Sequence, residues 1–422
     1  MMNQSQSRMP GRPLAASRLS RRDALRAGGA GLASGLVATN RVAAGHAQEA
    51  TPEPEAGERF SPERQQALTE IVLSALAATY TPGAVAGVWY PGQGSWMMAA
   101  GVSDLETAAP MALDDHVRIA SITKTFTATV VLQLVEEGLL SLDDHLEQFI
   151  TGIPNEEEIT LRQLLNMTAG IYNYVYDPLI SVDYVEDPLL PFTPEQAVEI
   201  VRAHGEADFA PGEQTVYSDT NYILLGVIIE QVTGRSVADE ITERVIVPLG
   251  LTRTSFATTP EMPEPYIHGY TAVDPGDPLR DVTRSNPDIP WTAGAIISTL
   301  ADLRTWAEAL ADGTLLSPEM QAERLDFQTL IPEPVYVGYG LGVASVNSLI
   351  GHNGGILGYS SWMVHEPESG ATIVTVTNRA STLGGTADPI FFGIAQLLFP
   401  DHFPAATGTP AAVPLGSGGD QD

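Results

Sequence analysis

Segments with a strand pattern occur near both ends of this chain, and that distribution restricts its fold more than any other feature. Apolar segments at 84–90 and 95–101, joined by Pro-Gly-Gln-Gly, predict a β-hairpin. Further strands are predicted near the other end, at 339–346, 352–354, 360–365 and 372–378. The economical arrangement joins both groups of strands in one sheet.

The residues between these strands, from about 115 to 325, have mostly helical patterns. Predicted helices cover 61–78, 122–137, 161–167, 194–203, 221–233, 237–245, 300–311 and 389–398. We therefore predict an α/β fold with an antiparallel sheet that is built from both chain ends and flanked by helices. An inserted, mainly helical lobe completes it.

Both termini differ in composition from the rest of the chain. Residues 20–25 read Ser-Arg-Arg-Asp-Ala-Leu, which resembles the twin-arginine export signature, and a short Gly- and Ala-rich segment follows. We predict a twin-arginine-type signal peptide at 1–47, a linker at 48–59, one folded domain at 60–402 and a disordered tail at 403–422. The signal predicts a periplasmic or extracellular protein; a disordered basic leader is the alternative.

The chain of 422 residues has no cysteine and a formal net charge of −31. Without cysteine, thiol nucleophiles, thiolate metal sites and disulfides are excluded. Nucleic acids and anionic membrane surfaces need basic patches, so the charge argues against both as partners. We expect a small-molecule or peptide substrate, and the sequence does not indicate an oligomeric state.

Lysine is almost absent from the chain. Of the 21 basic residues, 20 are arginine and only Lys124 is lysine. Arginine keeps its proton in proteins, whereas a desolvated lysine can lose it. The single lysine therefore indicates a site that needs a titrating amine. A genome-wide bias toward arginine is the alternative explanation.

Lys124 lies three residues after Ser121, in the pattern Ser-x-x-Lys. Positions i and i+3 of a helix share a face, so the hydroxyl and the amine point the same way. Lys124 is the only charge in 120–135, and burial lowers the pKa of an amine. A neutral Lys124 can take the proton of Ser121 and make it a nucleophile. Alternatively, Ser121 only caps the helix and Lys124 reaches the surface.

A second motif, Tyr217-Ser218-Asp219, precedes the helix predicted at 221–233. The phenol of Tyr217 can exchange protons with Lys124 and with a leaving group. A helix cap formed by Ser218 or Asp219 is the alternative.

A third motif, Gly-His-Asn-Gly-Gly at 351–355, precedes the strand predicted at 360–365. Glycines in a strand allow a ligand to approach the backbone closely, and a free N–H there can complete an oxyanion hole. A glycine turn with a surface histidine is the alternative.

Together and in this order, the three motifs resemble those of the serine β-lactamase and penicillin-binding-protein superfamily. That family reads S-x-x-K, then Y-x-N or S-x-N, then K-T-G or H-T-G. The likeness extends over about 60–400 and is strongest to the branch of D-alanyl-D-alanine carboxypeptidases and class C β-lactamases, which also contains esterases. It implies a β-lactamase/transpeptidase-like fold with the site between the sheet and the helical lobe.

The resemblance implies a role for each matching residue. Ser121 would be the acylated nucleophile, Lys124 its base and Tyr217 the second proton-transfer group. His352 would be the polar or cationic member of the third motif. The backbone N–H groups of Ser121 and Gly355 would form the oxyanion hole.

Two positions depart from the family pattern, since Asp219 stands where the family usually has Asn, and Asn353 where it usually has Thr or Ser. An ionised Asp219 cannot donate to a substrate carbonyl, and its charge would raise the pKa of Lys124. Asn353 replaces a hydroxyl that in relatives helps to bind a substrate carboxylate. The register also allows Ser218 in place of Tyr217 as the proton-transfer group.

A substrate carboxylate would have to approach an acidic surface, so we expect a cation near the site. The candidates are His352, Arg379 and Arg118. The complete set of predicted substrate-binding residues is Asp219, Asn353, Gly354 and Arg379.

Other chemistries lack their motifs. There is no G-x-S-x-G, so an α/β-hydrolase elbow is excluded, and the only lysine follows Thr123 rather than glycine, which excludes a P-loop. The eight histidines are scattered. We predict no metal and no cofactor.

The sequence thus predicts an exported serine hydrolase that works through an acyl-enzyme on Ser121. The expected activity is like that of a D-alanyl-D-alanine carboxypeptidase acting on D-amino-acid peptides. An esterase or β-lactamase on the same scaffold is the second hypothesis, which Asp219 and Asn353 motivate. A non-catalytic wall-binding relative is the third, and the retained lysine argues against it.

Overall fold

The computed structural model describes residues 59–272, 277–330, 338–381 and 384–403. The predicted signal peptide, nearly all of the predicted linker and nearly all of the predicted tail lie outside these residues. Within them, no helix combines the length and the apolar character that crossing a membrane requires.

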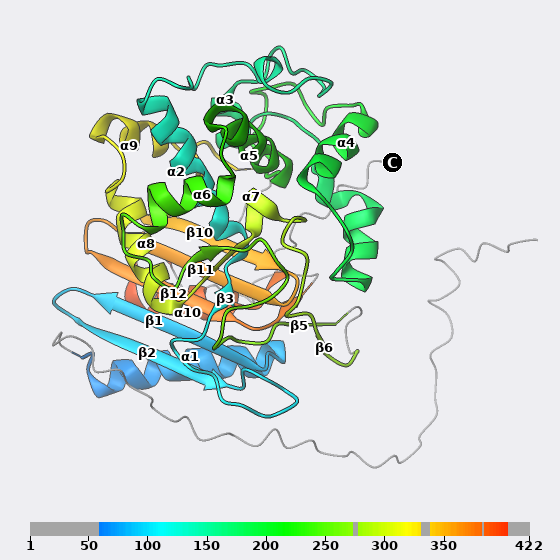
Figure 1. The fold of residues 1–422 in the computed structure, drawn as a ribbon. Helices are drawn as coiled ribbons and strands as arrows, with labels where there is room; N and C mark the ends of the chain where they lie inside the picture. Colours follow the sequence, from blue (N-terminus) through cyan, green and yellow to red (C-terminus); the bar gives the residue numbers. More distant parts are fainter. Residues whose placement is uncertain (1–58, 273–276, 331–337, 382–383, 404–422) are drawn as a thin grey trace, which may run out of the picture. The chain divides into compact units, whose positions relative to one another are not determined.

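One antiparallel sheet of seven strands combines segments from both ends of the chain (Figure 1). Its order is β2 (Gly94–Gly101), β1 (Gly83–Tyr90), β12 (Ala371–Thr377), β11 (Tyr359–Glu366), β10 (Leu349–Ile356), β9 (Ala344–Val346) and β8 (Gly338–Tyr339). The two groups of strands meet where β1 pairs with β12, with Val85 opposite Val376. The predicted fold class is confirmed.

The segment predicted as one strand at 339–346 instead forms two, β8 and β9. Between them Gly342 has a φ of 77°, in the left-handed region that glycine tolerates best. A Cβ at Gly342 would lie 2.1 Å from the Cβ of Ala128 on helix α2 (Thr123–Glu136). The strand is therefore interrupted where the chain turns closely against α2.

Helices cover both faces of the sheet. On one face α1 (Pro62–Thr79) packs with α10 (Asp388–Leu398), and the ring of Trp362 stacks on Phe391 with 4.0 Å between their centroids. On the other face α8 (Leu300–Asp312) lies against β11 and β12. Neighbouring residues of a strand point to opposite faces, so Trp362 and Met363 belong to different apolar clusters.

Local signals explain where several helices begin and end. Ser61 accepts a hydrogen bond from the N–H of Arg64 and precedes Pro62, the first residue of α1, as expected of an N-cap followed by proline. Helix α5 (Asp219–Thr233) ends at Gly234 and α8 at Gly313, both in the left-handed conformation.

The inserted lobe is mainly helical. Its principal elements are η1 (Ala120–Ile122), α2, α3 (Leu161–Leu165), α4 (Pro194–His204), α5, α6 (Val237–Ile241), α7 (Trp291–Gly294) and α9 (Pro318–Arg324). A small sheet of β3 (Val117–Arg118), β7 (Ile296–Ser298) and β4 (Ser255–Phe256) was absent from the sequence prediction. Its strands are too short to give a readable alternation.

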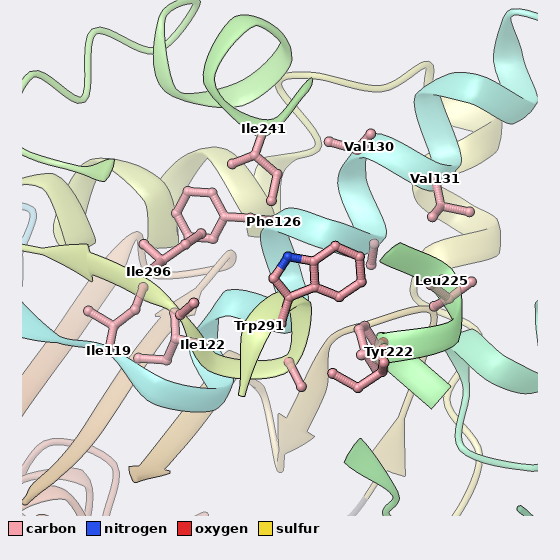
Figure 2. Packing of buried hydrophobic residues seen from close by; sticks show 14 of the residues in the cluster. Ile119, Ile122, Phe126, Val130, Val131, Tyr222, Leu225, Ile241, Trp291 and Ile296 are labelled. Carbon is pink, nitrogen blue, oxygen red and sulfur yellow. The ribbon is translucent and has the colours of Figure 1, made fainter. Parts of the chain in front are cut away.

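Helix α2 lies at the centre of the apolar cluster of this lobe. Figure 2 shows Phe126 and Val130 of α2 packed among residues of other elements, including Tyr222 of α5 and Trp291 of α7. Nearly every side chain of α2 is buried. A charged residue on this helix is therefore removed from water unless it lies at an opening.

Candidate active site

Ser121 lies in η1, the single turn that leads into α2. The preceding residue, Ala120, has a φ of 52°, which is uncommon for a residue with a side chain. Strand β10 packs directly against this turn, because a Cβ at Gly354 would lie 2.3 Å from the carbonyl oxygen of Ile119. The strained turn and the strand together hold Ser121 in place, partly exposed.

The side chain of Lys124 is completely buried and has three hydrogen-bond acceptors. Its Nζ lies 3.1 Å from Ser121 Oγ, 2.6 Å from Asp219 Oδ1 and 3.0 Å from the carbonyl oxygen of Ala293. An ammonium group has three protons to donate, so these contacts fit protonated Lys124. The predicted pair of hydroxyl and amine on one helix face is present in the structure.

Two opposing effects act on the pKa of Lys124. Burial is the larger, and it lowers the pKa below the usual value because the charged form loses its hydration. The charge and hydrogen bond of Asp219 raise it. Asp219 therefore opposes the activation of Lys124 as a base, as the departure from the family pattern leads us to expect.

Asp219 is the first residue of α5, where the helix dipole favours a negative charge. Its backbone N–H donates to Asn173 Oδ1 at 3.2 Å, and its Oδ2 accepts from Asn173 Nδ2 at 3.4 Å. The Asp219 side chain remains 21% exposed, in contrast to Lys124. The carboxylate therefore contacts the buried amine and is itself partly accessible to water.

Tyr217 lies next to Lys124, as the sequence predicts. The Nζ of Lys124 is 4.9 Å from the centroid of the Tyr217 ring. The neighbouring Ser218 turns away: its N–H donates to Met167 Sδ, and its buried Oγ has no hydrogen-bond partner among the described residues. The position favours Tyr217 over Ser218 as the proton-transfer group, which remains a prediction.

His352 is completely buried in β10, with its ring 6.0 Å from that of Tyr217. Its Nδ1 lies 2.5 Å from the carbonyl oxygen of Asn353, so Nδ1 carries the proton and Nε2 accepts from the hydroxyl of Tyr339 at 3.0 Å. Burial, and after it the charge of Lys124, lower the pKa of His352 to about 3. Of the two roles that the sequence leaves open, the polar one fits this environment and the cationic one does not.

The third motif places its glycines along β10 next to the nucleophile turn. Gly354 is buried against Ile119, whereas Asn353 and Gly355 are partly exposed. The elements that carry Ser121 and Gly355 are therefore packed together, as an oxyanion hole requires. The hole itself and the substrate contacts of Asn353 and Gly354 remain predictions.

The two arginines considered for carboxylate binding have other partners. Arg379 donates to the carbonyl oxygens of Thr79 and Tyr80 at the end of α1, at 2.7 and 2.9 Å. Arg118 is buried and donates to the carbonyl oxygens of Pro260 and Thr283. Both guanidinium groups are thus engaged by backbone carbonyls, and a substrate contact of Arg379 remains a prediction that these bonds do not support.

Three members of the site lack any signature in the sequence. Ala293 contributes only a backbone carbonyl, Asn173 lies between two tyrosines outside the three motifs, and Tyr339 appeared only as a strand residue. In the described part of the chain, no group of three or more His, Asp or Glu residues is arranged to hold a metal ion. The arrangement can perform acyl transfer to a serine that an amine activates.

Comparisons with known proteins agree with this arrangement. The sequence profile of the Beta-lactamase family matches residues 65–391. A D-aminopeptidase of Brucella anthropi is 30% identical over 315 residues, which cover 74% of this chain and 58% of the relative. Protein flp of Staphylococcus aureus (strain N315) is 27% identical over 334 residues, covering 76% and 65%. The chain thus spans less than two thirds of the length of either relative.

Two solved structures match the chain over nearly their whole length. A D-stereospecific amidohydrolase from Streptomyces sp. superposes with a TM-score of 0.71 at 35% identity, covering 80% of this chain and 99% of the other. The D-amino acid amidase from Ochrobactrum anthropi SV3, complexed with L-phenylalanine amide, gives 0.70 at 25% identity with the same coverage. Sequence, site and fold agree, and the chain belongs to the beta-lactamase/transpeptidase-like superfamily of serine hydrolases.

Proposed function

We propose that the protein hydrolyses amide bonds of D-amino-acid derivatives through an acyl-enzyme on Ser121. The observation that carries the proposal is the contact of 3.1 Å between Ser121 Oγ and the buried Nζ of Lys124. The substrate class is supported by similar proteins that are named a D-aminopeptidase, a D-stereospecific amidohydrolase and a D-amino acid amidase.

In the proposed reaction, neutral Lys124 takes the proton of Ser121 while Oγ attacks the carbonyl carbon of the substrate. The backbone N–H groups of Ser121 and Gly355 stabilise the resulting oxyanion. The carbon–nitrogen bond then breaks. The leaving amine takes the hydroxyl proton of Tyr217, which Lys124 replaces. In the second step, water attacks the carbonyl carbon of the acyl-serine. One proton of that water passes through Lys124 and Tyr217 to Ser121 Oγ, and the free acid leaves.

The environment of Ser121 favours a D-aminoacyl amide over the D-alanyl-D-alanine carboxypeptidase substrate that the sequence predicts. A carboxypeptidase has to bind a substrate carboxylate. His352 is neutral, and Arg379 and Arg118 donate to backbone carbonyls. The accessible charge beside the nucleophile is instead the carboxylate of Asp219. Activated esters form the second candidate class, because their acyl transfer needs little beyond Ser121 and Lys124.

The test is a panel of D-alaninamide, D-phenylalaninamide, their L-enantiomers and D-alanyl-D-alanine. Ser121→Ala should lower D-amide hydrolysis by about 1000-fold or more. The matched control is Ser218→Ala, which removes a nearby hydroxyl that has no partner in the part of the chain that the structure describes, and it should stay within about threefold of the wild type.

Full activity of the Ser121→Ala variant would overturn the mechanism. Preference for L-amides, or cleavage of D-alanyl-D-alanine alone, would overturn the proposed substrate class. Loss of activity in Ser218→Ala would instead assign the proton-transfer role to Ser218.

A further inference from the structure

The carboxylate of Asp219 has unused acceptor capacity and is partly accessible to solvent. Oδ1 accepts the short bond of 2.6 Å from Lys124, whereas within the described ranges Oδ2 has only the bond of 3.4 Å from Asn173. A carboxylate provides about four acceptor positions. Since the Asp219 side chain is 21% exposed, a donor that enters the site from solvent can reach it.

The surroundings of the Asp219 carboxylate favour a cation over an anion. Burial, and after it the charge of Asp219, raise the pKa of Tyr174 and Tyr176, so both phenols stay neutral and lie within the field of the carboxylate. Lys124, the one cation bonded to Asp219 in the described residues, is completely buried behind it. An ammonium group would meet a negative potential here, and a carboxylate would be repelled.

The spacing to the nucleophile suits an α-amino group. Asp219 Oδ1 and Ser121 Oγ contact the same nitrogen atom, Nζ of Lys124, at 2.6 and 3.1 Å. In an aminoacyl substrate a single carbon atom separates the amino nitrogen from the carbonyl carbon that Ser121 attacks. A substrate whose carbonyl carbon lies at Ser121 Oγ can therefore bring its amino nitrogen to the Asp219 carboxylate.

We propose that Asp219 is a specificity-determining residue that binds the free α-ammonium group of the substrate through Oδ2. The inference rests on the proposed function and narrows it to D-aminoacyl amides and peptides with an unmodified amino terminus. N-acylated D-amino-acid amides lack the charge that Asp219 recognises. An Asn at this position, as the family usually has, lacks the negative charge that attracts the ammonium group.

Binding of the ammonium also affects the base. The new positive charge beside Asp219 counteracts the charge that holds the proton on Lys124. Recognition of the amine is thereby coupled to the release of that proton to water, which leaves Lys124 neutral for the attack by Ser121. In the described part of the chain, the rings of Tyr217, Tyr222 and His352 also lie near Lys124. Burial raises the pKa of Tyr222 and lowers that of His352, so both are uncharged at neutral pH.

The test compares D-alanine p-nitroanilide with N-acetyl-D-alanine p-nitroanilide in the wild type, with p-nitrophenyl acetate as a neutral reporter of Ser121. We expect kcat/KM to favour the free amine by about 100-fold, as for a hydrogen bond between charged groups. Asp219→Asn should reduce this preference to a few-fold, mainly by raising KM for the free amine. Because Asp219 also bonds Lys124, p-nitrophenyl acetate measures separately the change that the lost charge causes in the acylation of Ser121.

Asp208→Asn is the matched control. Asp208 also contributes to the raised pKa of Tyr176, yet it is not among the hydrogen-bond partners of Lys124 in the described residues. This variant should keep the preference within about twofold.

A readout in the wild type does not depend on the folding of any variant. The α-amino group of an aminoacyl substrate loses its proton near pH 8, so the preference for the free amine should fall above that pH. The titration of Lys124 in the free enzyme affects both anilides equally, so it cancels in the ratio of their kcat/KM values.

Equal cleavage of both anilides by the wild type would overturn the inference and leave the proposed function intact. So would a preference that persists in Asp219→Asn or at pH 10. If neither anilide is cleaved while p-nitrophenyl acetate is, the proposed function fails and the inference fails with it.

Discussion

Replacing Lys124 by methionine separates the catalytic contribution of the amine from its effect on stability. Methionine is similar in length but has no charge to bury and no proton to donate. The change removes three hydrogen bonds, to Ser121, Asp219 and the carbonyl of Ala293. Without a base, acylation of Ser121 should fall by about 1000-fold, within the range that general base catalysis contributes.

The expected change in the free energy of unfolding follows from the burial of the two partners. Removing one member of a buried ion pair typically costs about 3–5 kcal/mol, because the other charge is left unpaired in the interior. Here Asp219 remains 21% exposed, so water can solvate it, and methionine avoids the desolvation of an ammonium. We therefore expect Lys124→Met to destabilise the protein by about 2 kcal/mol.

The double variant Lys124→Met/Asp219→Asn should recover at least half of that loss, since neither charge remains. Urea unfolding at pH 7 measures both differences, provided that the slope against urea is unchanged. Acylation by p-nitrophenyl acetate measures the catalytic effect. Activity within tenfold of the wild type in Lys124→Met would refute the role of the amine. A double variant no more stable than the single one would refute the energetic account of the ion pair.

Three further changes test other parts of the structure. Asp219→Asn removes the charge that raises the pKa of Lys124. The acidic limb of the pH–rate profile with p-nitrophenyl acetate should therefore move to lower pH. An unchanged limb, or a shift to higher pH, would contradict the assignment of Lys124 as the base. Arg379→Ala should lower the free energy of unfolding by about 1–2 kcal/mol, because its hydrogen bonds to the end of α1 are lost. KM should stay unchanged for acidic and neutral substrates. A rise in KM for acidic substrates alone would show that Arg379 binds the substrate. Gly354→Ala places a Cβ 2.3 Å from the carbonyl oxygen of Ile119 and should lower acylation by about 100-fold. In Gly250→Ala the new Cβ has no atom within 4 Å, so the change should cost only about 1 kcal/mol of backbone strain. Equal losses of acylation in the two variants would contradict the close contact of β10 and η1.

The parts of the molecule that local pattern determines could be predicted from the sequence. The strands of the main sheet and the long helices carry a period of two or of 3.6 residues, and Ser121 and Lys124 meet because three residues nearly complete a helical turn. Local pattern does not state the direction of a side chain at the end of a strand. Arg379 follows β12 as expected, yet its guanidinium points to the end of α1.

The other partners of Lys124 were harder to find because they are distant in the chain. Asp219 lies 95 residues away and Ala293 lies 169 residues away. Asp219 could be proposed because it falls in a motif, but a backbone carbonyl has no residue type to recognise. The neutral state of His352 likewise depends on burial by elements that only the tertiary structure brings together.

The position of β12 determines when during synthesis the candidate site can be completed. It is the last of the seven strands to leave the ribosome, yet it lies between β1 and β11 in the finished sheet. Until residue 377 emerges, the edge of β1 has no partner and can pair with other chains. The turn that carries Ser121 also packs on β10, another late strand. A nascent or truncated chain therefore holds the turn of Ser121 without the strand that packs on it, and the candidate site is complete only after the carboxyl-terminal strands have joined the sheet.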